Sequence, residues 1–147
     1  MLDKKDFAII EVLKHNSNFS TQQISKKTNI PITTVHNHIK KLEKGGVIEG
    51  YTIRLNNKKI GKNVAAYINI IVDYKLLKEK NMSQHELAKK LKRQEIAEEV
   101  ALVTGETDIL LKIRVKNVEE LDDFLTKYLR NIEGIEKTKT MVILHEF

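Results

Sequence analysis

Hydrophobic positions near the amino terminus follow the spacing of two successive helices. Val35, Ile39 and Leu42 come at intervals of four and three residues, which places them on one stripe of a helix over residues 32–44. A shorter helix over residues 21–28 is predicted to precede it. The pattern therefore predicts a pair of helices that bury one side each and leave the other side polar.

The connection between these helices is short and conformationally restricted. Asn29 falls where the chain leaves the first helix, and asparagine tolerates a left-handed backbone. Pro31 prevents the first helix from continuing because its ring fixes φ, and Gly45 and Gly46 end the second helix. Two short helices joined by a tight turn are typical of a helix-turn-helix, with the second as the recognition helix. The alternative is a plain helical hairpin whose polar side is merely solvated.

The polar residues of the second helix lie largely off its hydrophobic stripe. They supply hydroxyl, carboxamide, imidazole and ammonium groups, which suit the base edges and phosphates of double-stranded DNA. The residues expected to read bases are Thr33, Thr34, His36 and Asn37. The residues expected to contact phosphates are Lys40, Lys41, Lys44 and Arg54, and His38 is assigned to the same DNA-binding surface.

A third helix is predicted over residues 3–15, and residues 47–55 alternate enough to predict a strand or small wing after the helix-turn-helix. We therefore expect a three-helix winged head. Its predicted core consists of Leu2, Phe7, Ile10, Leu13, Ile24, Ile30, Val35, Ile39 and Leu42.

Hydrophobic alternation and capping signals predict a different second half. Strands are expected over residues 63–73, 96–104, 109–115 and 136–145, and helices over 83–92 and 118–132, with 74–82 as a polar connection. Ser83 followed by Glu86 is a capping box. The order βαββαβ is ferredoxin-like, and its two helices cover only one face of the sheet. We therefore predict an α+β protein that dimerises through the other face.

The net charge of +6 is concentrated in the first half of the chain. Residues 1–62 hold 12 Lys and Arg against five Asp and Glu, whereas residues 63–147 hold 14 against 15. This asymmetry is expected if the first half meets a polyanion. A basic membrane-surface module would need an amphipathic helix with large exposed apolar residues, and the sequence has none.

Several classes of site are excluded or disfavoured. The chain has no cysteine, which excludes disulfides, zinc–thiolate sites and thiol catalysis. His36 and His38 are two positions apart on a helix and do not face each other, so we expect no metal and no cofactor. Glu106 and Asp108 have no nucleophile nearby in sequence, which argues against an enzyme built on the ferredoxin-like half. Without a signal peptide or a long apolar run, a cytoplasmic protein is expected.

Three segments together resemble the leucine-responsive regulatory protein family, also called the feast/famine regulators. They are LDKKDFAIIEVL, TTVHNHIKKLEKGGVIEGYT and EEVALVTGETDILLKIRV, and the resemblance covers essentially the whole chain. It implies DNA binding as dimers and larger assemblies, often octamers, and a response to amino acids. It departs from the family pattern at His38, where an arginine is usual, at Pro31, where a serine is frequent, and in a longer connection over 74–82.

The resemblance also implies an effector site at a glycine-x-x-aspartate turn. Gly105 and Asp108 match that turn, and Thr104 and Thr107 flank them as candidates. An amino acid offers an ammonium group to a carboxylate and a carboxylate to backbone N–H groups, although a purely structural turn is the alternative for Asp108.

We therefore expect three segments: a DNA-binding domain over 1–55, a linker over 56–62, and a dimerisation and sensing domain over 63–147. The predicted function is a sequence-specific transcriptional regulator modulated by an amino acid or a related small molecule. An architectural DNA-binding protein without an effector is the alternative.

Overall fold

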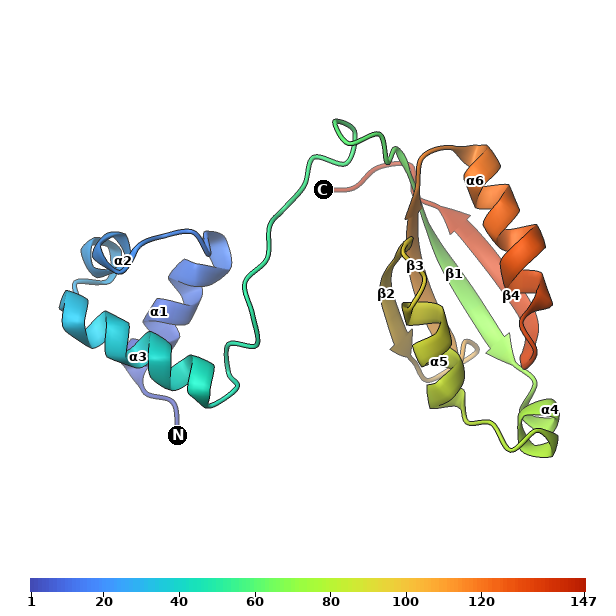
Figure 1. Ribbon diagram of the computed structural model, residues 1–147, viewed down its shortest axis with the longest axis horizontal. Coiled ribbons are helices and arrows are strands. Elements are labelled where there is room, and N and C mark those ends of the chain that lie inside the picture. The colour runs from blue at the N-terminus through green and yellow to red at the C-terminus, as the bar shows by residue number, and fades with distance from the viewer. The chain divides into compact units, whose positions relative to one another are not determined.

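The computed structural model describes residues 1–147, and the chain divides into two compact units, Met1–Arg54 and Leu55–Phe147 (Figure 1). The first unit contains three helices and no strand. They are α1 (Lys4–His15), α2 (Thr21–Thr28) and α3 (Ile32–Lys44). Each bound lies within one residue of the bounds predicted from hydrophobic spacing, and the helix-turn-helix is confirmed.

The core of the first unit differs from the predicted core at one position of α1. Ile9 is fully buried with Ile24 and Val35, whereas the side chain of Phe7, expected in this core, is 56% exposed. Positions 6, 9, 10 and 13 recur at helical spacing and face inward, and Phe7 lies about 100° away from that side of the helix. The inward position next to it belongs to Asp6, which is fully buried.

Residues 47–55 leave α3 without forming a strand. No backbone group of residues 49–55 makes a backbone hydrogen bond within the chain. The predicted strand is therefore wrong for the single chain, because the head offers this segment no strand to pair with.

The second unit is a four-stranded antiparallel sheet with the order β2-β3-β1-β4. Its strands are β1 (Val64–Val72), β2 (Ala97–Leu102), β3 (Ile109–Val115) and β4 (Ile135–Val142). Its main helices are α5 (Gln84–Lys92) and α6 (Val118–Asp123), and α6 continues through π-helical Phe124–Tyr128 and 3₁₀ Leu129–Asn131. This arrangement confirms the ferredoxin-like prediction.

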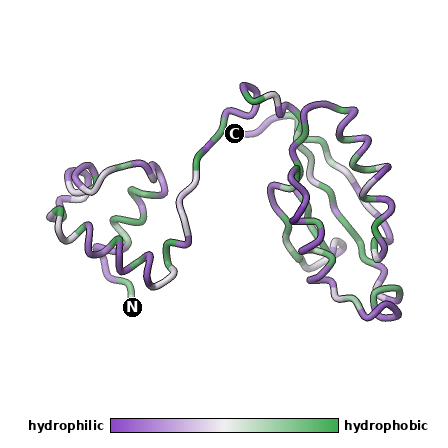
Figure 2. The backbone as a smooth tube through the Cα atoms, in the orientation of Figure 1, coloured by the Kyte–Doolittle hydropathy of each residue, from purple (hydrophilic) through white to green (hydrophobic).

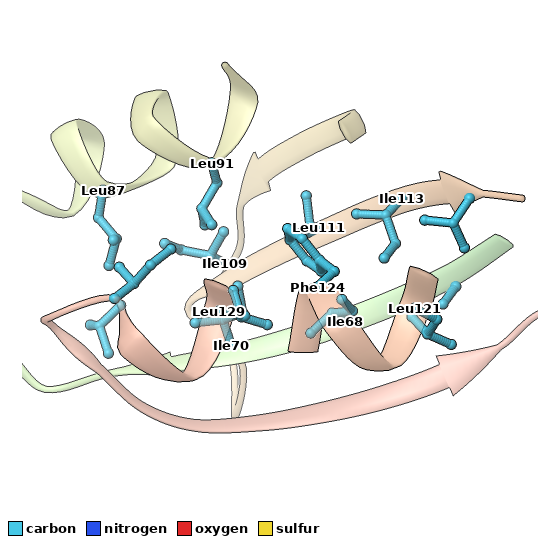
Figure 3. Close-up of a cluster of buried hydrophobic side chains, with 14 of the residues drawn as sticks. Ile68, Ile70, Leu87, Leu91, Ile109, Leu111, Ile113, Leu121, Phe124 and Leu129 are labelled. Carbon is cyan, nitrogen blue, oxygen red and sulfur yellow. The ribbon is translucent and has the colours of Figure 1, made fainter. Parts of the chain in front are cut away.

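Helices α5 and α6 cover one face of the sheet and enclose the core of the second unit (Figures 1 and 3). Ile68, Leu111 and Ile113 come from the strands and Leu87 and Phe124 from the helices, and all five are buried in one cluster between the two layers. Hydrophobic residues dominate the two central strands, β1 and β3, while the helices alternate between hydrophobic and hydrophilic positions (Figure 2). The helices alternate because only one side of each is buried against the sheet.

The connection after β1 is more ordered than predicted. Residues Tyr74–Glu79 form a short helix, α4, which begins where Oδ1 of Asp73 accepts the backbone N–H of Leu76 at 2.9 Å. Leu77 is buried and packs beside Gly134. The segment was predicted only as a polar connection, and the helix within it was not predicted, because one buried leucine anchors an otherwise polar helix. None of the helices combines the length and apolar character needed to cross a membrane.

Candidate DNA interface and effector turn

The turn between α2 and α3 has the backbone geometry that was predicted from its sequence. Ser20 and Gln23 form a reciprocal capping box that begins α2. Asn29 ends α2 in the left-handed region, at φ 56° and ψ 27°. Pro31, at φ −55°, stands directly before α3, where its missing N–H is no loss. These local preferences set where the recognition helix begins.

The outer side of α3 presents polar side chains that the protein itself does not use. None of them makes a side-chain hydrogen bond or ion pair within the chain. The exposed members are Thr33, His36, Asn37, Lys40 and Lys44. Thr34 is half-buried and lies four and seven positions before His38 and Lys41, on their side of the helix. Such a surface has free donors and acceptors for base edges and free charges for phosphates.

His38 and Lys41 lie on the side of α3 that is turned toward α1. Nδ1 of His38 lies 2.7 Å from Oδ1 of Asp6, and Nζ of Lys41 lies 2.8 Å from Oδ2 of the same carboxylate. The hydrogen bond from Lys41 is the main reason why the carboxyl pKa of Asp6 lies far below its usual range, and it raises the pKa of Lys41 in turn. Asp3 joins this cluster, which is a satisfied ion-pair network and not an open set of metal ligands.

Arg54 is exposed at the end of the first unit and also makes no hydrogen bond within the chain. Residues 47–54 and the end of α1 line a surface groove of about 650 Å³ that includes Arg54 and Leu13. Tyr51 ties this segment to α3 through a 2.7 Å hydrogen bond to Glu43, and partial burial together with that bond raises the pKa of Tyr51 to about 12. Arg54 is thus free to meet an external anion.

The predicted effector turn connects β2 to β3. Thr104 and Gly105 are exposed, whereas Thr107 and Asp108 are half-buried. Gly105 has φ +106°, a conformation that side-chain-bearing residues rarely adopt. Glycine is therefore required at this position by the backbone itself.

Asp108 is heavily engaged by the protein. Its Oδ2 accepts the backbone N–H of Val72 at 2.9 Å, and its Oδ1 accepts the hydroxyl of Tyr74 at 2.8 Å. The Asp108 carbonyl accepts the side-chain amide of Gln84 at 3.2 Å and the backbone N–H of Val103 at 3.0 Å. The hydrogen bond to Asp108 raises the pKa of Tyr74. Asp108 therefore joins the end of β1 to the starts of α4 and α5.

The sheet face opposite the helices carries an ion-pair network in place of a plain apolar surface. Arg114 is buried and bonds both Glu98 and Glu146, the latter at 2.8 Å. Lys112 also bonds Glu146 at 2.8 Å, so the carboxyl-terminal residues are held to this face. Nζ of Lys112 lies 5.6 Å from the centroid of the Tyr67 ring, which is a cation–π contact.

Sequence reasoning missed several residues that organise these sites. The burial of Asp6 was not predicted, because an acidic residue near the start of a helix usually indicates only a favourable interaction with the helix dipole. Tyr74 and Gln84 were missed because their partner is distant in sequence. For Asp6, the sequence does carry a signal, since its position matches the helical spacing of the buried residues of α1.

Comparison with known proteins gives consistent matches over nearly the whole chain. The Lrp/AsnC ligand binding domain family matches residues 66–147, and the winged helix-turn-helix DNA-binding family matches residues 2–49. An uncharacterized HTH-type transcriptional regulator of Pyrococcus horikoshii is 41% identical over 97% of this chain and 92% of its own length. HTH-type transcriptional regulator FL11 of Pyrococcus furiosus is 38% identical over 98% of this chain and 90% of its own.

Solved structures share the fold. Bacillus subtilis LrpC is 26% identical, has a TM-score of 0.83, and is matched over 100% of this chain and 97% of its own. A transcriptional regulator from Neisseria meningitidis, solved as an L-Met complex, is 21% identical with a TM-score of 0.90, over 99% of this chain and 92% of its own.

Proposed function

The chain belongs to the Lrp/AsnC family of DNA-binding transcriptional regulators, and we propose that it recognises its operator through the outer side of α3. The observation that carries this proposal is the set of exposed side chains on α3 that have no partner within the chain. Polar groups without partners in the protein break no hydrogen bond within the protein when they bind DNA.

The proposed contacts divide by chemistry. Thr33, Thr34, His36 and Asn37 read base edges in the major groove, where asparagine suits adenine. Lys40, Lys44 and Arg54 bind phosphates and supply affinity that depends on salt. Lys41 is half exposed beside Asp6, so it adds charge near the phosphates. His38 was predicted on the same surface, but it points toward α1 and is bonded to Asp6, so no DNA contact is proposed for it.

We propose that a second copy of the chain covers the open sheet face. Exposed acidic residues, Glu98 and Glu99, lie on the β2 edge, and Lys137 and Lys139 lie on the β4 edge. A two-fold axis parallel to the strands would place β2 of one copy opposite β4 of the other, which pairs unlike charges. Two recognition helices in one dimer would then read half-sites about 34–36 Å apart. Larger assemblies such as octamers follow from the family resemblance.

We propose that an amino acid binds at the turn formed by Thr104, Gly105, Thr107 and Asp108. The L-Met complex of the Neisseria meningitidis protein supports this class of ligand. Backbone N–H groups of the turn suit a carboxylate, and Asp108 suits an ammonium group. A ligand that binds one assembly better than another would shift which DNA geometry the protein holds.

One observation favours the architectural alternative, a DNA-binding protein without an effector. Both carboxylate oxygens of Asp108 are already bonded, to Val72 and to Tyr74. A thermal-shift screen of the twenty amino acids separates the two functions, because a sensor gains stability with its ligand and an architectural protein gains none.

DNA binding also sets the expected location and chemistry. A transcriptional regulator acts where the DNA is, so we propose a cytoplasmic protein. The family and the relatives are transcriptional regulators rather than enzymes, and we propose that the chain catalyses no reaction.

The α3 surface is tested by matched substitutions. The double variant Asn37→Ala, Lys40→Ala is compared with Lys89→Ala, Lys90→Ala, which changes two exposed residues of α5. Fluorescence anisotropy on DNA from upstream of the protein's own coding sequence should show at least tenfold weaker binding for the α3 variant only, about the effect of one lost base contact. Equal affinities for the two variants would contradict the proposed surface.

A further inference from the structure

The segment that follows the first unit carries a concentration of positive charge. Residues 50–72 contain no Asp or Glu, and they contain four cations, Arg54, Lys58, Lys59 and Lys62. Lys58 and Lys59 are exposed, and Lys62 is half-buried. None of the three lysines makes a side-chain hydrogen bond or an ion pair within the chain. The charge of this segment is therefore not compensated by the protein itself.

Backbone hydrogen bonds give residues 56–62, which we call the lysine turn, a defined shape. The carbonyl of Asn56 accepts the N–H of Lys59 at 3.0 Å, and the carbonyl of Asn57 accepts the N–H of Lys62 at 2.9 Å. Oδ1 of Asn56 also accepts the N–H of Lys59, at 3.2 Å. Gly61 has φ +75°, a conformation that glycine adopts without strain. Because the backbone of the turn is already ordered, binding to its lysines costs little backbone entropy.

The covalent chain keeps the lysine turn close to a residue expected to contact DNA. Four residues separate Arg54 from Lys58, so their Cα atoms lie at most about 14 Å apart. Phosphates of one DNA strand recur about every 3.4 Å along the helix axis, so roughly four of them fall within this span. A phosphate bound by Arg54 therefore has neighbours that Lys58 can reach.

The composition of the lysine turn suits phosphates better than other anionic partners. A lysine ammonium is a compact charge with three donors, and it binds phosphate oxygens without a fixed bidentate geometry. An anionic membrane surface would require several apolar anchors beside the charges. The turn offers only Ile60, which is 48% exposed. The DNA backbone is therefore the partner that these residues favour.

We propose that the lysine turn is a second DNA-contacting surface, which binds phosphates beside the half-site that α3 reads. Such contacts add affinity that depends on salt, and they carry no sequence information. The turn belongs to the second unit, so the contact of each chain with DNA extends beyond the helix-turn-helix. This inference rests on the proposed recognition of DNA through α3.

Removal of all three lysines tests this surface against a control of equal charge. The turn variant replaces the lysines of the lysine turn by glutamine: Lys58→Gln, Lys59→Gln and Lys62→Gln. The control variant replaces three exposed lysines of α4 and α5 that make no ion pair: Lys75→Gln, Lys89→Gln and Lys90→Gln. Both variants lose three positive charges, so the effect of net charge cancels in the comparison. Circular dichroism establishes that both are folded.

The measurement is the affinity of the full chain for DNA from upstream of its own coding sequence, over a series of salt concentrations. The slope of log affinity against log salt should be shallower in the turn variant than in the control by about 0.9 for each of the three lysines. The ratio of affinities for upstream and shuffled DNA should be the same in both variants, because phosphate contacts carry no sequence information. A difference in slope smaller than the contribution of one lysine would overturn the inference.

Hydroxyl-radical footprinting of the same DNA locates the contact. The control variant should protect sugar positions beside the half-site that the turn variant leaves exposed, and identical footprints would also overturn the inference. A wild-type protein that binds upstream DNA selectively, with equal slopes in the two variants, would overturn this inference alone. Absence of DNA binding by the wild type even at low salt would overturn the proposed function as well.

Discussion

The hydroxyl of Tyr74 donates a 2.8 Å hydrogen bond to Oδ1 of Asp108, a residue 34 positions further along the chain. Tyr74 is the first residue of α4, the helix that follows β1. The residue best matched to an effector site is thus bonded by a side chain from the connection between β1 and α5. Tyr74 and any ammonium group that binds Asp108 compete for the same oxygen.

Replacement of Tyr74 by phenylalanine should strengthen amino-acid binding. The ammonium group then has Oδ1 of Asp108 to itself, and the affinity should rise about fivefold, which corresponds to about 1 kcal/mol, the order of the net free energy of one hydrogen bond. Isothermal titration with the amino acids that stabilise the wild type measures this change. Tyr51→Phe is the control, because it removes a tyrosine–carboxylate bond in the first unit. Unchanged affinity in Tyr74→Phe would show that the ligand does not use this oxygen.

Replacement of Gly134 by alanine should destabilise the second unit by about 1–3 kcal/mol. Gly134 has φ +94°, and a Cβ there would lie 2.5 Å from Cδ2 of Leu77 in α4. Gly50→Ala is the matched control, since its Cβ would meet nothing within 4 Å and its φ is not in the left-handed region. Urea denaturation followed by circular dichroism compares the two. Equal midpoints would mean that α4 does not pack on Gly134 as described.

Acid should destabilise the first unit through Asp6. Its pKa is lowered in the folded protein, chiefly by the hydrogen bond from Lys41. A lowered folded pKa means that the carboxylate stabilises the fold above its unfolded pKa of about 3.9, and that this stabilisation is lost as pH falls toward the folded value. Amide NMR signals of Ile9 and Val35 during thermal melts between pH 7 and 2 report on this unit.

Asp6→Asn should be less stable than wild type at pH 7 and should lose less stability on acidification. Glu106→Gln is the control, because Glu106 is exposed and makes no ion pair. A wild-type protein whose first unit is as stable at pH 2 as at pH 7 would contradict the role of Asp6.

The sequence was most informative where local preferences and packing agree. The ends of α2 and α3 follow from Ser20, Asn29, Pro31 and Gly45, each of which acts on its own neighbourhood. The same holds for α5, where the predicted capping box of Ser83 and Glu86 is present. These features depend on a few adjacent residues, so a single sequence contains all the information that they need.

Long-range contacts account for most of what the sequence did not reveal. Phe7 was expected inside because it is large and apolar, but the inward position is held by Asp6. The burial of Asp6 depends on His38 and Lys41, which are 32 and 35 residues away. Helix α4 is held in place because Leu77 packs against Gly134. Residues 47–55 form no strand because the first unit contains no strand with which they could pair. The role of Asp108 stayed open for the same reason.

Reversal of charge at Glu146 should weaken the proposed dimer. Glu146→Lys would place a cation against Arg114 and Lys112 on the open sheet face. Sedimentation equilibrium should show at least a tenfold higher dimer dissociation constant, as expected for like charges at an interface. Glu133→Lys, which breaks an exposed pair with Lys80, is the control. A monomeric wild type would contradict the proposed assembly.

Removal of single lysines from α3 should change the salt dependence of DNA binding. Lys40→Ala and Lys44→Ala should each reduce the slope of log affinity against log salt by about 0.9. Lys90→Ala, on α5, should leave the slope unchanged. An equal slope for all three variants would show that the lysines of α3 do not meet phosphates.

The most direct test of the central claim is fluorescence anisotropy of the full chain on DNA from upstream of its own coding sequence, against shuffled DNA, at two salt concentrations. We predict selective binding to the native sequence that weakens as salt rises. Equal binding to both DNAs would point to the architectural function. No binding even at low salt would contradict the claim that this chain acts by binding DNA through its recognition helix.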